Sequence, residues 1–140
     1  MLKIPKRIYD DIIAHSREGF PLEICGILGG RDGVVSEIYR MTNTDQSNEH
    51  FMMDAKEQFA VVKELRAKGL AMLAIYHSHP ETPARPSEED IRLALTPDVS
   101  YLIVSLAEQA TPDIRSYLIS RGCVTAEPLE LLADRANLFT

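Results

Sequence analysis

Cysteine is scarce in this sequence: 140 residues include only Cys25 and Cys123. Two thiols cannot build the disulfide framework of a small secreted domain, nor a cysteine-rich zinc site. We therefore expect a reducing, cytoplasmic setting, although one disulfide between the two residues is left open.

Long apolar runs are also absent. No stretch of about 18 apolar residues occurs, so no transmembrane helix is expected. Residues 1–7 include basic side chains, but no apolar segment follows them as it would in a signal peptide. These absences predict a protein that has no membrane contact.

An excess of positive charge is missing as well. The chain has 15 Lys and Arg against 21 Asp and Glu, a net charge of −6, which counts against nucleic acid as a partner. An apolar fraction of 45% and a charged fraction of 26% are typical of globular proteins. Since no internal repeat or low-complexity tract stands out, we expect residues 1–140 to form a single domain.

The hydrophobic pattern predicts helices and strands in mixed order. Pro5 opens a helix that ends near Gly19, and residues 22–30 and 34–40 form a hairpin around a glycine-rich turn. Residues 43–49 form a polar loop. A second helix follows, with Asp54 and Glu57 as a capping box and with Phe59, Val62 and Leu65 on its buried face.

The second half continues in the same way. We expect strands at 71–77, 101–106 and 113–120 and a helix at 87–95. Beyond Glu127 the leucines at 129, 131, 132 and 138 indicate either a docking segment or a partner surface. This order of elements predicts an α/β fold with a central mixed sheet.

Two histidines at the end of the strand 71–77 form the most informative motif. His77 and His79 are two residues apart, so on a strand they project to the same face, about 6.6 Å apart along the chain. Imidazole and carboxylate groups are zinc ligands, and three of them leave one coordination position open for water. By itself the His-x-His pair is a weak signal, because structural histidines show the same pattern.

Ser87 and Asp90 open the next predicted helix. Their spacing fits an N-cap and its third helical position, which is a structural role. Asp90 is equally placed to supply a third metal ligand. The Ser87 hydroxyl could accept a backbone N–H and still donate its own hydrogen to an oxyanion, so capping and catalysis are compatible.

A water-activating site also needs a general base that is not itself a ligand. Glu23 is the best candidate, because it is a single carboxylate within the apolar residues 21–28. Burying such a charge without a partner is costly, which makes Glu23 either a strand-edge residue or a functional one. Cys25 could share its face, but a small buried hydrophobe is the expected role.

Taken together, these residues resemble the JAMM (MPN-plus) metallopeptidases. The pattern of that family is a glutamate near the N-terminus, then His-x-His-Pro, then Ser-x-x-Asp, with ten residues between the second histidine and the aspartate. The sequence matches without gaps at Glu23, at residues 77–80 and at residues 87–90. The similarity extends from about residue 21 to residue 106 and is strongest to the compact bacterial and archaeal members.

The resemblance implies a cytidine-deaminase-like three-layer fold with a central mixed β-sheet flanked by helices. It implies one Zn²⁺ per chain bound by His77, His79 and Asp90, with Glu23 as the general base and Ser87 supporting the oxyanion. It also implies hydrolysis of an amide or isopeptide bond at the C-terminal Gly-Gly tail of a ubiquitin-like protein, in compact members often a sulfur carrier.

Two other functions stay open at this point: a non-catalytic MPN-type scaffold and a zinc hydrolase of a small amide. All five motif positions are filled, which disfavours the scaffold. A nucleobase deaminase is disfavoured because the sequence has no Pro-Cys-x-x-Cys ligand pair. A homodimer is left open.

Overall fold

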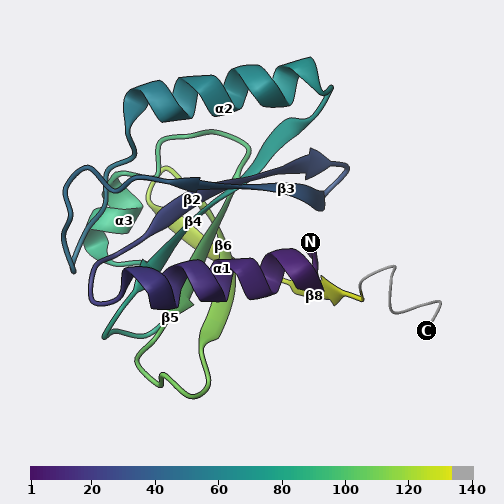
Figure 1. The fold of residues 1–140 in the computed structure, drawn as a ribbon. Coiled ribbons are helices and arrows are strands. Elements are labelled where there is room, and N and C mark those ends of the chain that lie inside the picture. Colours follow the sequence, from purple (N-terminus) through teal and green to yellow (C-terminus); the bar gives the residue numbers. More distant parts are fainter. Residues whose placement is uncertain (134–140) are drawn as a thin grey trace.

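The structure is a computed structural model of residues 1–140, of which residues 1–133 are described here. Eight strands and three helices alternate along this part of the chain (Figure 1). In order they are β1 (Leu2–Pro5), α1 (Lys6–Gly19), β2 (Cys25–Arg31), β3 (Val34–Met41), α2 (Ala55–Ala67), β4 (Ala71–His79), α3 (Glu88–Arg92), β5 (Ser100–Ser105), β6 (Asp113–Ser120), β7 (Cys123–Glu127) and β8 (Leu129–Leu132).

All eight strands belong to one mixed sheet in the order β7-β6-β5-β4-β2-β3-β1-β8. The pairs β4–β5, β1–β3 and β1–β8 are parallel, and the other neighbours are antiparallel. β4 lies in the middle, hydrogen-bonded to β2 on one side and to β5 on the other. A side chain at the end of β4 therefore sits on a strand that is held on both edges.

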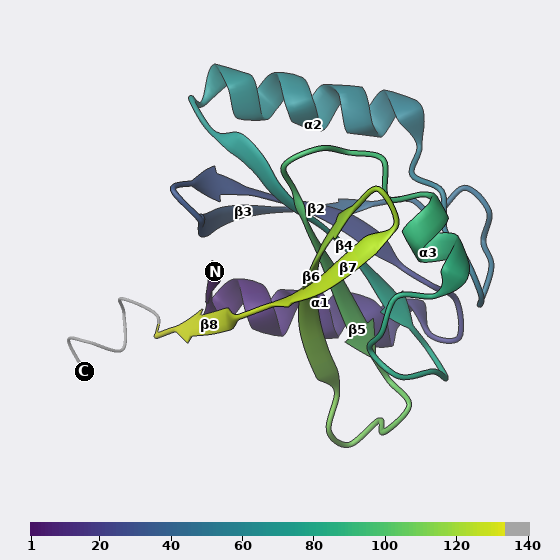
Figure 2. The ribbon, with the colours of Figure 1, turned by 180° about the vertical axis from the view of Figure 1, so that it is seen from behind.

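The helices cover both faces of the sheet. Helix α1 lies in front of the strands in Figure 1 and behind them in Figure 2, whereas α2 and α3 belong to the opposite side. The α1 side is filled by Ile8 and Ile12 against Leu28, Tyr76 and Leu102. On the α2 side, Val61 and Leu65 pack on the sheet residues Cys25 and Ile27. The observed arrangement has the three layers that the resemblance implies.

Alternation along β4 decides which layer receives each side chain. Ala74 and Tyr76 belong to the core under α1, and Ile75 belongs to the core on the other face. Because successive strand residues point to opposite faces, His77 and His79 share the face of Ile75. Both histidines therefore project toward α3.

The first helix and the 22–40 hairpin are confirmed, with one shift. Strand β2 begins at Cys25, not at residue 22. Glu23 precedes the strand because its N–H donates to the Ser47 carbonyl at 2.8 Å and is not available to the sheet. The strand at the histidine motif extends two residues further than predicted, to His79.

The buried face of α2 was predicted correctly at Leu65 and wrongly at Phe59. Phe59 is 72% exposed, and Val61 and Leu65 are the buried residues. Phe59 lies two residues before Val61, about 200° around the helix, so both cannot face the sheet. The cap is also only half as predicted: Asp54 accepts from two backbone N–H groups, but Glu57 binds Thr42 instead of returning to Asp54.

The second half needs three further corrections. The helix predicted over 87–95 is shorter, Glu88–Arg92. Strand β7 was not predicted, because its exposed edge position leaves no hydrophobic alternation. Strand β8 pairs with β1, so this part of the C-terminal segment docks on the sheet. Leu138 lies outside the described residues.

Two expectations concern absences. Both cysteines are free, Cys25 buried and Cys123 exposed, so the disulfide that was left open does not form. Within the described residues no helix is both long and apolar enough to cross a bilayer.

Candidate metal centre and active site

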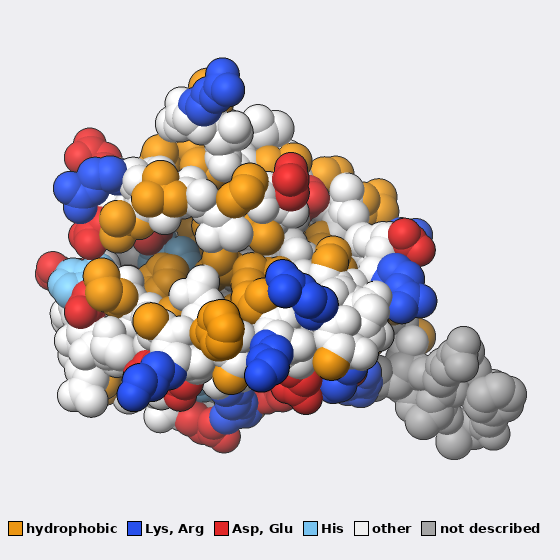
Figure 3. Space-filling view, turned by 90° about the horizontal axis from the view of Figure 1, so that it is seen from above, with side chains coloured by type: hydrophobic (Ala, Val, Ile, Leu, Met, Phe, Trp, Pro, Cys, Tyr) orange, Lys and Arg blue, Asp and Glu red, His pale blue; other side chains and the backbone are white. Residues whose placement is uncertain are grey.

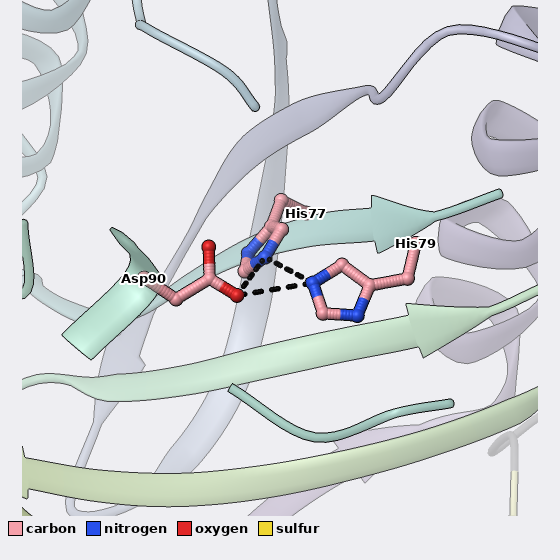
Figure 4. Close-up of side chains that lie close together, drawn as sticks. All are labelled: His77, His79 and Asp90. Atoms are coloured by element: carbon pink, nitrogen blue, oxygen red, sulfur yellow. Dashed lines mark hydrogen bonds and ion pairs between the residues drawn. The ribbon is translucent and has the colours of Figure 1, made fainter. Parts of the chain in front are cut away.

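The structure brings His77, His79 and Asp90 together at the end of β4 (Figure 4). His79 Nε2 lies 3.0 Å from Asp90 Oδ2, and His77 Nε2 lies 3.2 Å from both of these atoms. Both histidines are buried, at 3% and 4% exposure. The three residues thus point one ligand atom each at a common centre.

Second contacts orient two of these groups. His79 Nδ1 lies 2.9 Å from the Pro83 carbonyl, which can only accept, so Nδ1 carries the hydrogen and leaves a lone pair on Nε2. Asp90 Oδ2 also accepts the Ser87 N–H at 2.9 Å. Phe51 stacks on the His77 ring, with 4.6 Å between the ring centres. The loop after β4 and the start of α3 therefore hold the site in shape.

The residues fit a zinc ion. At zinc–ligand distances of about 2.0–2.1 Å, ligand atoms of a tetrahedral site are about 3.3 Å apart, close to the observed 3.0–3.2 Å. His77 Nδ1 is buried without a hydrogen-bond partner in the described chain. Nδ1 can therefore carry the ring hydrogen, which leaves the lone pair of Nε2 available for coordination. Three lone-pair atoms facing one point require a cation or a shared proton between them.

The charges of the cluster agree with this requirement. Burial lowers the pKa of His77, which favours its neutral, ligating form. The hydrogen bond between His79 and Asp90 raises the pKa of His79, although burial acts in the opposite direction. The contacts of Asp90 with His77 and His79 lower the pKa of Asp90, again against the effect of burial. A proton at His79 and a metal ion at the centre would therefore compete.

Glu23 is the second part of the site. Its side chain is 3% exposed, and Oε1 has no hydrogen-bond partner among the described residues. Burial raises the pKa of Glu23 to about 8, and the charges of His79 and Asp90 act on it. A buried carboxylate with a free oxygen beside a ligand cluster can accept a proton at neutral pH.

Ser78 ties Ile24, the residue after Glu23, to the strand that carries the histidines, a contact that was not predicted. Its hydroxyl accepts the Ile24 N–H at 2.9 Å, and its own N–H donates to the Ile24 carbonyl at 3.0 Å. Ser78 is fully buried between the two histidines in sequence, on the opposite face of β4. A buried hydroxyl needs a partner, but its identity is not visible in the sequence, because Ile24 is 54 residues away.

Ser87 takes the capping position that was predicted. Its Oγ accepts the Asp90 N–H at 3.0 Å, and Asp90 Oδ2 accepts the Ser87 N–H in return. The cap uses a lone pair of Ser87 Oγ, so it does not consume the hydroxyl hydrogen. Ser87 is also exposed. The cap orients Asp90 toward the histidines, so the capping role of Asp90 is compatible with a ligand role.

A cavity of about 240 Å³ opens beside the ligand cluster. His77 and Asp90 form one side of it, and Phe51, Met53 and Leu93 form apolar walls. Hydrophobic side chains are exposed around a hollow on the face seen from above in Figure 3. A substrate bond placed here would be next to the ligands and partly shielded from water.

A family model described as prokaryotic homologs of the JAB domain matches residues 5–120. The chain belongs to this family.

Two curated relatives and two solved structures support the assignment. The CysO-cysteine peptidase of Mycobacterium tuberculosis is 34% identical over 134 residues, covering 94% of this chain and 92% of that protein. The probable TtuB-protein conjugate cleaving protease of Thermus thermophilus is 32% identical, covering 87% and 78%. A protein from Desulfitobacterium hafniense has 47% identity and a TM-score of 0.88, covering 96% and 94%. A JAB1/MPN domain protein from Archaeoglobus fulgidus, with 20% identity, a TM-score of 0.63 and coverage of 94% and 97%, shares the fold.

The predicted family and fold class are thereby confirmed: the chain is a peptidase of the JAMM type with a three-layer α/β fold. A structure described as a metalloprotease-like zinc site, with 20% identity and a TM-score of 0.61, shares this fold too. The residue assignments rest on the geometry above.

Proposed function

We propose that this JAMM-family chain is a zinc-dependent peptidase that cleaves the amide bond after the C-terminal Gly-Gly tail of a ubiquitin-like sulfur-carrier protein. The observation that carries the proposal is the convergence of three ligand atoms, together with a buried Glu23 whose Oε1 has no partner in the described residues and whose carboxylate feels the charges of His79 and Asp90. His77, His79 and Asp90 would hold the zinc. The chemistry that a bound zinc ion supplies is polarisation of the scissile carbonyl and a lowered pKa for a water molecule.

Glu23 moves the proton in this scheme. It takes a proton from the attacking water as the C–O bond forms, and passes it to the nitrogen as the C–N bond breaks, so that the products are a carboxylic acid and an amine. In the metal-free site burial raises the pKa of Glu23 to about 8, and the positive charge of a bound zinc ion would favour the ionised carboxylate that accepts the proton. The proton therefore begins on water and ends on the leaving amine.

Ser87 supports the oxyanion. Its Oγ is fixed by the N–H of Asp90, a metal ligand, so the hydroxyl is held beside the reacting carbonyl. Its hydrogen can donate to the negative oxygen that develops during attack. The cap thus positions the donor before the reaction.

The Gly-Gly tail suits the narrow approach to the site. Glycine has no side chain to exclude it from the space between α3 and the 50–53 segment, and the apolar walls of the cavity remove water from the amide bond. The mycobacterial relative is named a CysO-cysteine peptidase and the Thermus relative a probable TtuB-protein conjugate cleaving protease. These names support the substrate class that we propose, a conjugate of a small carrier protein. Such carriers and two free cysteines fit a cytoplasmic location.

The test uses two matched substrates: a sulfur-carrier protein extended by cysteine after its Gly-Gly end, and the free tripeptide Gly-Gly-Cys. Mass spectrometry should show loss of cysteine from the protein at a kcat/KM at least tenfold above that of the peptide. Equal values would indicate a hydrolase of small amides instead. Cleavage of neither substrate by the zinc-loaded protein would contradict the proposal.

A further inference from the structure

Asn43, just after β3, uses its whole side-chain amide in hydrogen bonds. Nδ2 donates to the Glu23 carbonyl at 3.0 Å and to the His50 carbonyl at 3.1 Å. Oδ1 accepts the N–H groups of Asp45 and Met52, each at 3.1 Å. A primary amide has two donor hydrogens and two acceptor lone pairs, so none remains free.

These four bonds join two parts of the site. Glu23 lies on one side. On the other lies the 50–53 segment, whose residues line the cavity and whose Phe51 stacks on His77. The Oε1 atom of Glu23 has no partner among the described residues, so its position depends on the backbone that carries it.

We infer that Asn43 is a positioning residue, which sets the place of Glu23 relative to the 50–53 segment and thereby to the substrate bond. The inference rests on the proposed function. Two other contacts hold the same loop: the Ser47 carbonyl accepts from Glu23 N–H at 2.8 Å, and the Met52 carbonyl accepts from Thr44 N–H at 2.8 Å. Asn43 contacts both sides with one side chain, so it couples the two.

Asn43→Asp tests this coupling because it replaces the amide nitrogen by a carboxylate oxygen with almost no change in volume. The acceptor bonds from Asp45 and Met52 are kept, while the donors to Glu23 and His50 are replaced by an oxygen that repels their carbonyls. Asn48→Asp is the matched control. Asn48 lies in the same loop, is exposed, and has no side-chain hydrogen bond within the described part of the chain.

In the Asp variant we expect kcat on the carrier substrate to fall about 10- to 100-fold, with KM within threefold and zinc content unchanged. Asn43→Ala removes all four bonds, so KM should rise as well, because the 50–53 segment is released. Asn48→Asp should keep both constants within twofold. A purely structural role would lower stability without this split between kcat and KM.

Amide hydrogen exchange on the metal-free variants supplies a readout independent of activity. The Glu23 N–H should exchange at least tenfold faster in both Asn43 variants than in Asn48→Asp. The Met52 N–H should stay protected in the Asp variant and lose protection in the Ala variant. If the Asp variant does not fold, the Ala variant decides.

Unchanged exchange at Glu23 overturns the inference, and so does an Asn43→Asp enzyme as active as the control. If the wild-type protein cleaves no carrier substrate, the proposed function fails, and the inference that Asn43 positions Glu23 then stands or falls on the exchange rates.

Discussion

Two glutamates of this protein, the half-buried Glu127 and the buried Glu23, differ in how their carboxylates are paired. Glu127, at the end of β7, has a side chain that is 9% exposed, and its Oε1 accepts the hydroxyls of Ser100 and Ser116, each at 2.6 Å. Glu23 is 3% exposed, and its Oε1 has no partner in the described residues. One carboxylate joins three neighbouring strands, and the other lies beside the metal-ligand cluster.

The difference shows that a carboxylate with low exposure can serve the structure when it is hydrogen-bonded and can be available for chemistry when it is not. At Glu127 the loss of hydration is offset by two charge-assisted hydrogen bonds. At Glu23 it is not offset, and the strain appears as a pKa raised to about 8. An uncompensated buried acid costs stability, and the general-base role that we propose for Glu23 gives that cost a functional reason.

The largest expected effect comes from removing one of the proposed zinc ligands. His77→Ala should abolish both zinc binding and activity, because two ligands do not hold the ion against water. Zinc per chain, measured by mass spectrometry after dialysis, should fall from about one to near zero. The Glu127→Gln protein should keep its zinc.

In the wild type, zinc occupancy should also fall as the pH drops below about 6.5, since protons compete for the histidines.

Exchanging each glutamate for glutamine should separate the two roles. Glu23→Gln should retain zinc and lose about 10²- to 10⁴-fold in kcat, because an amide cannot accept the proton. Glu127→Gln should stay within twofold of the wild type. The measurement is steady-state cleavage of the carrier substrate. Comparable losses in both variants, or full activity in Glu23→Gln, would erase the distinction.

Stability should respond in the reverse order. Glu127→Ala leaves two buried serine hydroxyls without their acceptor and should lower the free energy of unfolding by about 2 kcal/mol. Urea denaturation measures this. A change below about 0.5 kcal/mol would mean that the serines find other partners.

The last and most specific effect is a gain in stability that depends on pH. The pKa of Glu23 is raised from 4.5 to about 8, so this group contributes most to the stability of the folded wild type below pH 4.5. The contribution is lost as the pH rises through 8. Glutamine mimics the neutral acid at every pH. Metal-free Glu23→Gln should therefore match the wild type near pH 4.5 and exceed it in stability by several kcal/mol, up to about 5, above pH 8. Thermal melts in a chelator across this range decide; a difference that does not vary with pH would mean that the carboxyl keeps its ordinary pKa.

Of the two glutamates, only Glu23 could be singled out from the sequence. Glu23 stood out because it interrupts an apolar segment, and His77, His79 and Asp90 stood out by spacing. Glu127 gave no signal, since strand β7 lacks hydrophobic alternation and both of its serine partners are on other strands. Phe59 misled the prediction for α2, because its neighbours could not show which side of the helix meets the sheet.

Local chemistry explains where prediction succeeded. Alternation along β4 places both histidines on one face, and the Ser87–Asp90 spacing sets the cap, because both follow from the geometry of a few consecutive residues. The family pattern was therefore available from the sequence by itself, and so were the residues that we propose as ligands and general base. What only the tertiary structure decided is that Glu23 lies unpaired beside this cluster, and that Asn43 and Ser78 hold its backbone in place. Those contacts join residues 20 and 54 positions apart, and packing of the whole sheet brings them together.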